Sequence, residues 1–125
     1  MESENRVTLH ERCGIPIIEI SGTVSGSIEK DLLAAHKMAC QSQPRPQNIL
    51  IKFVKHGRIY SSGVNALIRL VVEAEKREQK VYATGLSEHF FHIFSLTALT
   101  KCIQVFPSEE EALHVLKRGC CKERR

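Results

Sequence analysis

Short apolar runs alternate with amphipathic stretches along this chain, and the alternation predicts an α/β domain. The predicted element order is β-β-α-β-α-β-α-β-α. Strand-like patterns cover residues 7–10, 15–21, 49–54, 79–84 and 102–106. Together these patterns predict one mixed sheet of roughly four to five strands, with about four helices packed on it.

The two strands nearest the N-terminus are predicted to pair as a β-hairpin. Residues 11–14 between them end in Gly14, which suits a tight turn. Pro16 falls at the start of the second strand, where a missing N–H group is tolerated. Residues 49–54 are apolar except for Lys52 and predict a central strand buried on both faces. Residues 55–60 are then expected to turn the chain.

Helical spacing of apolar residues is clearest after residue 62. The core-facing stripe predicted there consists of Val64, Leu67, Ile68, Val71 and Val72. Ser87 and Ser108 are expected to cap two later helices, and Ser108 with Glu111 forms a capping box. The helix after Ser87 carries an aromatic cluster of Phe90, Phe91 and Phe94. Core packing is the favoured interpretation of this cluster, and an exposed docking face is the alternative.

The length of 125 residues fits one domain, which we expect to cover residues 1–118 and to be followed by a basic flexible tail at 119–125. The formal net charge is +4, and residues 117–125, with five Lys or Arg residues against Glu123, account for all of it. A nucleic-acid-binding protein usually has a basic face on its fold, so we expect no nucleic-acid partner. No apolar run approaches the roughly 18 residues of a membrane span, and residues 1–5 do not look like a secretory signal. We therefore expect a cytoplasmic protein.

Cysteine and histidine give little support for a metal or cofactor site. The five cysteines form no C-x-x-C pair, and an odd number argues against a closed disulfide framework. Cys120 and Cys121 beside Lys122 are a candidate redox or metal handle, although two thiols in a loose tail are the favoured interpretation. His89 and His92 have no carboxylate-rich metal pattern around them. We expect neither a metal nor a cofactor.

The segment Tyr60-Ser61-Ser62-Gly63 lies between a predicted buried strand and the clearest predicted helix. Unpaired N–H groups and the helix dipole favour an anion at such a helix start. A phosphate on a serine there would add roughly −1.5 to −2 charge at pH 7. The segment is therefore a candidate phosphorylation switch. The alternative is that Ser61 or Ser62 only caps the helix and that Gly63 permits close packing.

Several segments follow one another in a characteristic order: Ile18-Glu19-Ile20-Ser21-Gly22, Tyr60-Ser61-Ser62-Gly63-Val64, Gly85-Leu86-Ser87, Leu96-Thr97-Ala98-Leu99 and Val105-Phe106-Pro107-Ser108-Glu109-Glu110-Glu111-Ala112-Leu113. In this ordered set, residues 17–116 resemble STAS domains, the family of anti-sigma factor antagonists and of the cytoplasmic tails of sulfate transporters. The resemblance implies a sheet covered on one side by helices. It also implies that the loop before the second predicted helix is the working surface.

For the antagonist branch, the resemblance implies that Ser61 is phosphorylated by a partner that is both an anti-sigma factor and a serine kinase. The unmodified domain would bind this partner, and the phosphorylated domain would be released. The implied partner-binding residues are Ser25, Tyr60, Ser61, Ser62 and Gly63. No nucleic acid is implied as a partner, and the oligomeric state, monomer or homodimer, stays open.

The chain departs from the family pattern at two positions near Ser61. Tyr60 stands where an acidic residue usually precedes the two serines, and Ser25 stands where the loop after the hairpin commonly has Asp. The segment before the serines carries Lys55, His56 and Arg58, which form a candidate anion-binding set. An anionic partner or ligand is therefore easier to accommodate here than in the usual family member.

The leading hypothesis is a non-catalytic protein-interaction switch in bacterial signal transduction that controls transcription. The alternative is a STAS-type module that senses a small anionic ligand, such as a nucleotide or a lipid head group, at the same helix start. An enzyme is not expected, because the sequence ties no His or carboxylate to Ser61 and contains no G-x-S-x-G motif.

Overall fold

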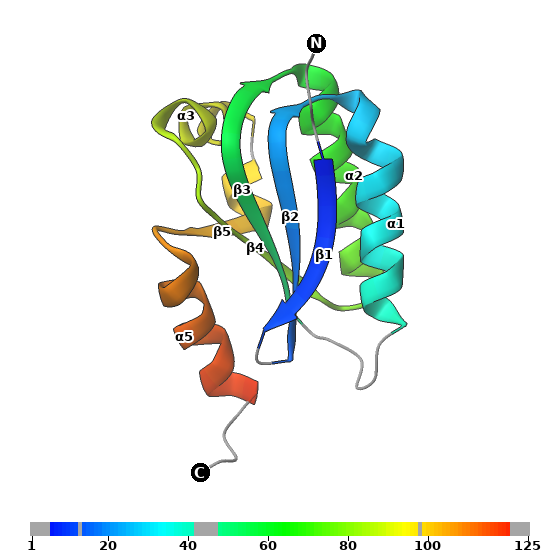
Figure 1. The fold of residues 1–125 in the computed structure, drawn as a ribbon, viewed down its shortest axis with the longest axis vertical. Coiled ribbons are helices and arrows are strands. Elements are labelled where there is room, and N and C mark those ends of the chain that lie inside the picture. The colour runs from blue at the N-terminus through cyan, green and yellow to red at the C-terminus, as the bar shows by residue number, and fades with distance from the viewer. Residues whose placement is uncertain (1–5, 13, 42–47, 98, 121–125) are drawn as a thin grey trace.

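A five-stranded sheet with the order β1-β2-β3-β4-β5 forms the centre of the computed structural model, which describes residues 6–12, 14–41, 48–97 and 99–120 (Figure 1). Its strands are β1 (Arg6–Arg12), β2 (Ile15–Val24), β3 (Asn48–Ile59), β4 (Lys80–Thr84) and β5 (Ile103–Phe106). The helices are η1 (Gly26–Ile28), α1 (Glu29–Cys40), α2 (Ser61–Lys76), α3 (Glu88–Leu96), α4 (Leu99–Cys102) and α5 (Glu109–Cys120). β1 and β2 are antiparallel, whereas the other neighbouring strands are parallel. The predicted α/β class, mixed sheet and N-terminal hairpin are confirmed.

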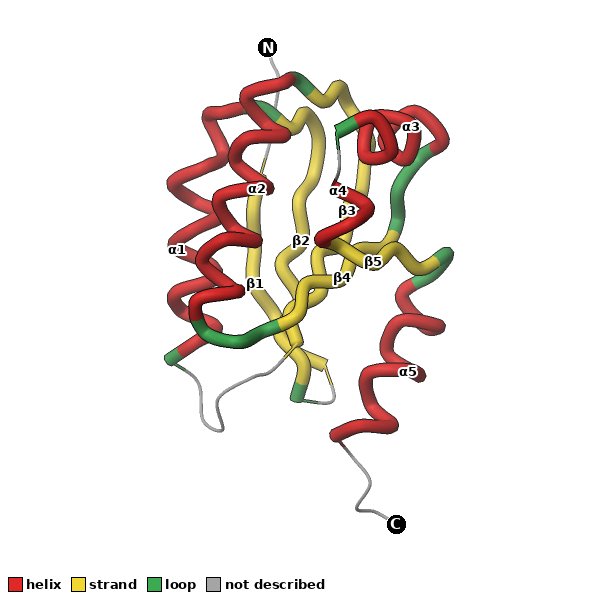
Figure 2. Tube along the Cα trace, turned by 180° about the vertical axis from the view of Figure 1, so that it is seen from behind, coloured by secondary structure: helices red, strands yellow, loops and turns green. Residues whose placement is uncertain are grey.

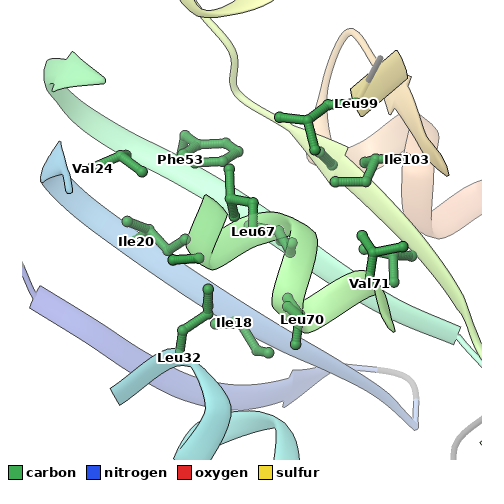
Figure 3. Close-up of a cluster of buried hydrophobic side chains, with 14 of the residues drawn as sticks. Ile18, Ile20, Val24, Leu32, Phe53, Leu67, Leu70, Val71, Leu99 and Ile103 are labelled. Carbon is green, nitrogen blue, oxygen red and sulfur yellow. The ribbon is translucent and has the colours of Figure 1, made fainter. Parts of the chain in front are cut away.

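The larger hydrophobic core lies between the sheet and helices α1, α2 and α3. Successive side chains of a strand point to opposite faces of the sheet. On this face, Ile18 and Ile20 of β2 and Phe53 of β3 are buried together with Leu67 and Leu70 of α2. Figure 3 shows the two leucines of α2 lying over these strands. The helices therefore bury the apolar side of the strands that lead to the segment Tyr60-Ser61-Ser62-Gly63, called the Ser61 segment below.

The predicted apolar stripe of α2 is only partly buried. Val64, Leu67 and Val71 lie in the core, but Ile68 is 39% exposed and Val72 is 42% exposed. The buried face of α2 is turned away from Ile68 and Val72, because Ala66 and Leu70 are fully buried instead.

The last helix, α5, covers the opposite face of the sheet from α1 and α2 (Figures 1 and 2). A second, smaller core there joins Ile15, Ile17 and Leu50 of the strands to Leu113 and Leu116 of α5. The expectation that helices cover only one side of the sheet is therefore wrong for α5. The physical reason is that β2 and β3 are apolar on both faces, so each face needs a cover against water.

Strand β3 is longer than predicted. Residues 55–60 were expected to turn the chain, but β3 continues to Ile59 and the turn is confined to Tyr60. The extension is stabilised by pairing with β2, in which Gly22 aligns with His56 and Val24 aligns with Ile59 after two register shifts. These shifts mark irregularities that increase the local bending of a strand.

Both predicted serine caps are confirmed. Ser87 Oγ accepts a hydrogen bond of 3.1 Å from Phe90 N–H, and Ser108 Oγ accepts one of 3.2 Å from Glu111 N–H. Each cap satisfies a backbone donor that has no partner inside its own helix. α3 and α5 consequently begin where the sequence indicates.

The aromatic cluster of α3 divides between core and surface. Phe90 and Phe94 are fully buried and make edge-to-face contacts with Phe53 at ring-centroid distances of 5.5 and 5.9 Å. Phe91 is 48% exposed. Core packing is therefore the correct interpretation for two members of the cluster and not for Phe91.

The N-terminal end of α5 is tied to the sheet by Glu109. Its carboxylate lies 2.7 Å from the Lys52 ammonium group and 2.7 Å from the Arg12 guanidinium group. The hydrogen bond from Lys52, followed by that from Arg12, lowers the pKa of Glu109 from its ordinary value of 4.5, although burial opposes this effect. The carboxylate form therefore stabilises the packing of α5 on the sheet.

We expect Glu109→Gln to lower the free energy of unfolding by about 0.5–1 kcal/mol at pH 7. Because the folded-state pKa is lowered, this stabilisation is complete above the unfolded-state pKa and is lost as pH falls through the folded-state pKa. Urea denaturation at pH 7 and at about pH 3 measures the difference. Glu110→Gln is the matched control, because Glu110 is exposed in the same first turn. An equal loss of unfolding free energy in both variants would contradict a stabilising role of the Glu109 ion pairs. A loss in Glu109→Gln that is as large at low pH as at pH 7 would contradict it as well.

Candidate functional site

The Ser61 segment begins where β3 ends, at the edge of the sheet where β2 also ends and α1 and α2 start (Figure 1). Tyr60 is the N-cap residue of α2 and has an extended backbone with φ −106° and ψ 163°. Its N–H group donates a 2.9 Å hydrogen bond to the Val24 carbonyl oxygen. The start of α2 is thereby fixed to the end of β2, a segment far away in the sequence.

The Ser62 hydroxyl group holds the neighbouring loop. Its Oγ accepts a 2.8 Å hydrogen bond from the N–H group of Gly26, the first residue of η1. Gly26 lies so close that a Cβ atom added there would be 3.0 Å from Ser62 Cβ. Ser62 therefore joins the segment after β2 to the segment after β3. It does not cap its own helix.

Gly63 lies directly against the end of β2. A Cβ atom at this position would come within 2.3 Å of the Val24 carbonyl oxygen and 2.5 Å of the Val24 carbonyl carbon. Real Cβ atoms do not approach backbone atoms this closely, so only glycine fits. The predicted close packing at Gly63 is thus present, and its partner is the backbone of Val24.

Ser61 has different surroundings from Ser62. It is the first residue of α2, and its side chain is exposed. Within the part of the chain that the structure describes, the Ser61 hydroxyl group has no hydrogen-bond partner, and α2 has no side-chain cap. The interpretation of Ser61 or Ser62 as the N-cap of α2 is therefore wrong. The neighbouring Tyr60 side chain is 50% exposed.

Ser25 lies in the loop that Ser62 holds. Its Oγ atom is 2.9 Å from Ser27 Oγ, and its carbonyl oxygen accepts a 3.1 Å hydrogen bond from Ile28 N–H. The residue is half-buried. The fold thus brings the whole predicted partner-binding set to one edge, and we call it the Ser61 rim: Ser25, Tyr60, Ser61, Ser62 and Gly63.

The candidate anion-binding residues are placed only in part. Arg58 is exposed near the end of β3, whereas the side chains of Lys55 and His56 lie outside what the structure describes. Cys121 also lies outside it. Among the described residues, no group of three or more His, Cys, Asp or Glu side chains is arranged to hold a metal ion. None of the described helices is both long and apolar enough to cross a membrane.

Two residues of the site were missed from the sequence. Gly26 donates to Ser62, and Val24 provides the carbonyl group against which Tyr60 and Gly63 lie. A glycine inside the break between β2 and α1 is a weak signal for Gly26. No local signal identifies Val24, because it acts through its backbone.

The STAS domain family matches residues 6–112. No curated protein matches the sequence. Solved structures of other proteins share the fold. An anti-sigma factor antagonist from Mycobacterium paratuberculosis is 15% identical with a TM-score of 0.71, covering 91% of this chain and 95% of that one. A sulfate transporter family protein from Wolinella succinogenes is 18% identical with a TM-score of 0.72, and the alignment covers 87% of this chain and 89% of that one. The unphosphorylated form of the anti-sigma factor antagonist SpoIIAA is 19% identical with a TM-score of 0.70, and the alignment covers 91% of this chain and 97% of that one.

The family match covers most of the chain, and the fold is similar to that of the solved structures. The protein belongs to the STAS domain family.

Proposed function

We propose that this protein is a non-catalytic interaction switch of the anti-sigma factor antagonist type. In this proposal the Ser61 rim binds an anti-sigma factor that is also a serine kinase, and phosphorylation of Ser61 releases it. The observation that carries the proposal is the difference between the two serines. Ser62 is engaged with Gly26, whereas Ser61 is exposed at the start of α2.

The position of Ser61 suits a phosphoryl acceptor. In the transfer, the Ser61 oxygen bonds to the γ-phosphorus of ATP, the bond to the β-phosphate oxygen breaks, and the hydroxyl proton goes to a base on the kinase. The new phosphate faces the N-terminal end of α2, where the helix dipole favours an anion. The fold therefore tolerates a charge that changes the docking surface.

Release follows from the change in charge. The Ser61 rim contains no acidic side chain, so a partner surface that is complementary to it is not arranged to bind a phosphate of roughly −1.5 to −2 charge. Tyr60 offers a half-exposed aromatic side chain, a residue type that often anchors protein interfaces. Desolvating the phosphate at such an interface is costly unless cations meet it, and that cost favours dissociation.

The test compares Ser61→Ala with Ser62→Ala. Each protein is incubated with ATP and with the ATP-binding protein recovered on the immobilised wild-type chain from the native lysate, and its intact mass is measured. We expect the wild type and Ser62→Ala to gain one phosphate and Ser61→Ala to gain none. Ser61→Glu is expected to weaken capture of the same protein by at least about tenfold.

Two results would contradict the proposal. The first is a Ser61→Ala protein that is phosphorylated as well as the wild type. The second is a wild-type chain that recovers no ATP-binding protein but is strongly stabilised by a free nucleotide in a thermal shift assay. That outcome favours the alternative, a STAS-type module that senses a small anionic ligand.

A further inference from the structure

Exposed apolar side chains are concentrated along α2. The part of the chain that the structure describes has seven exposed large apolar side chains: Met38, Tyr60, Ile68, Val72, Phe91, Leu96 and Val115. Tyr60, Ile68 and Val72 belong to α2 or to its N-cap residue. Single apolar side chains on a surface are normal, but apolar side chains that follow one another along a helix mark an interaction site.

Ile68 and Val72 lie on the same face of α2 as Ser61. Residues three or four apart in a helix share a face, so positions 61, 65, 68 and 72 follow one another along α2. All four side chains are exposed, whereas Leu67 lies over the sheet (Figure 3). We call this face the α2 stripe: Ser61, Asn65, Ile68 and Val72.

The Ser61 rim is too small to hold a protein partner by itself. A stable protein–protein interface covers about 800 Å² on each partner, which takes roughly 20–30 residues. The rim has five residues, of which Gly63 is buried and Ser25 is half-buried. A partner that binds at Ser61 therefore also covers surface beside the rim.

The apolar surface beside the rim is the α2 stripe. On its other side the rim is followed by the start of α1, where Lys30 and Asp31 are exposed. Removing charged side chains from water is costly, whereas covering Ile68 and Val72 is favourable. Exposed Leu96 adds apolar area on the same side of the sheet, at the end of α3 (Figure 2).

We propose that the α2 stripe is the second part of the surface that binds the anti-sigma factor and serine kinase, and that it contacts an amphipathic helix of this partner. The inference rests on the proposed function of the Ser61 rim. Ile68 and Val72 are one helical turn apart, which is the spacing at which two packed helices interlock their side chains. Ile68 lies about 10 Å from Ser61 along the helix axis, so it contributes to binding and not to phosphoryl transfer.

The test places a charge in the α2 stripe without changing Ser61. Ile68→Lys and Val72→Lys are compared with Val115→Lys, the matched control, because Val115 is an exposed apolar residue of α5 on the opposite face of the sheet. The probe is the purified ATP-binding protein that the immobilised wild-type chain recovers. We expect both stripe variants to bind it at least about tenfold more weakly, and Val115→Lys to bind it like the wild type.

Phosphorylation of the same variants shows which step the stripe serves. The stripe variants are expected to need about tenfold more chain for half-maximal phosphorylation of Ser61, at an unchanged maximal rate, as measured by intact mass. Circular dichroism checks that each variant is folded. Val72→Lys decides the matter if Ile68→Lys does not fold, because Val72 is the more exposed of the two.

Three results would overturn the inference. Stripe variants that bind and are phosphorylated like the wild type remove the role of the stripe and leave the Ser61 switch intact. A wild-type chain that recovers no ATP-binding protein ends both proposals. A wild-type dimer in size-exclusion chromatography that Ile68→Lys converts to a monomer assigns the stripe to a second copy of this chain instead.

Discussion

Gly63→Ala is expected to destabilise the domain by about 3 kcal/mol or more. Alanine normally stabilises a helix relative to glycine, by roughly 0.5–1 kcal/mol. At Gly63, however, the new Cβ atom would lie 2.3 Å from the Val24 carbonyl oxygen. Backbone cannot rotate away as a flexible side chain does, so α2 must move off β2. The same movement would stretch the hydrogen bonds that Tyr60 and Ser62 make to the end of β2 and to Gly26.

Chemical denaturation followed by circular dichroism measures the effect of Gly63→Ala. Gly14→Ala is the matched control. Gly14 has φ +79° but nothing lies within 4 Å of an added Cβ atom, so that variant reports only the left-handed backbone strain, about 1 kcal/mol. A Gly63→Ala protein as stable as Gly14→Ala would show that α2 does not depend on this contact. In that case the Ser61 rim is less rigid than described.

Phe94→Ala is expected to lower the free energy of unfolding by about 3–5 kcal/mol, which is a large share of the total stability of an ordinary domain. Phe94 is fully buried and makes an edge-to-face contact with Phe53, with ring centroids 5.9 Å apart. Removing its ring opens a cavity between α3 and β3, and it also removes the aromatic contact. Thermal unfolding is expected to shift to a lower temperature by many degrees.

Phe91→Ala provides the control for Phe94→Ala within the same helix. Phe91 is 48% exposed, so its truncation removes much less buried area, and we expect a loss of about 1 kcal/mol or less. Similar losses in the two variants would contradict the observed division of the aromatic cluster. A stable Phe91→Ala protein also provides a direct test of whether this exposed ring contacts a partner.

Features that depend on residues close together in the chain could be predicted from the sequence. The caps at Ser87 and Ser108 are examples, because capping joins residues three positions apart. The extension of β3 could not be predicted. Its pairing partners, Gly22 and Val24, are separated from it by the whole of α1, and its register passes through two irregularities. The position of α5 was likewise missed. The spacing of apolar residues predicts that one face of this helix is buried, but it does not predict which face of the sheet the helix covers.

The sequence by itself determined the order of the five strands and the four longer helices, the STAS resemblance and the presence of a Ser-Ser-Gly segment at the start of a helix; the short helices η1 and α4 were not predicted. Only the tertiary structure decided that Ser62 is engaged and Ser61 is exposed. Successive residues of a helix point about 100° apart, so adjacent hydroxyl groups meet different neighbours. Which of them meets Gly26 depends on how the end of β2 packs against α2, and that packing is a long-range contact that no local pattern encodes.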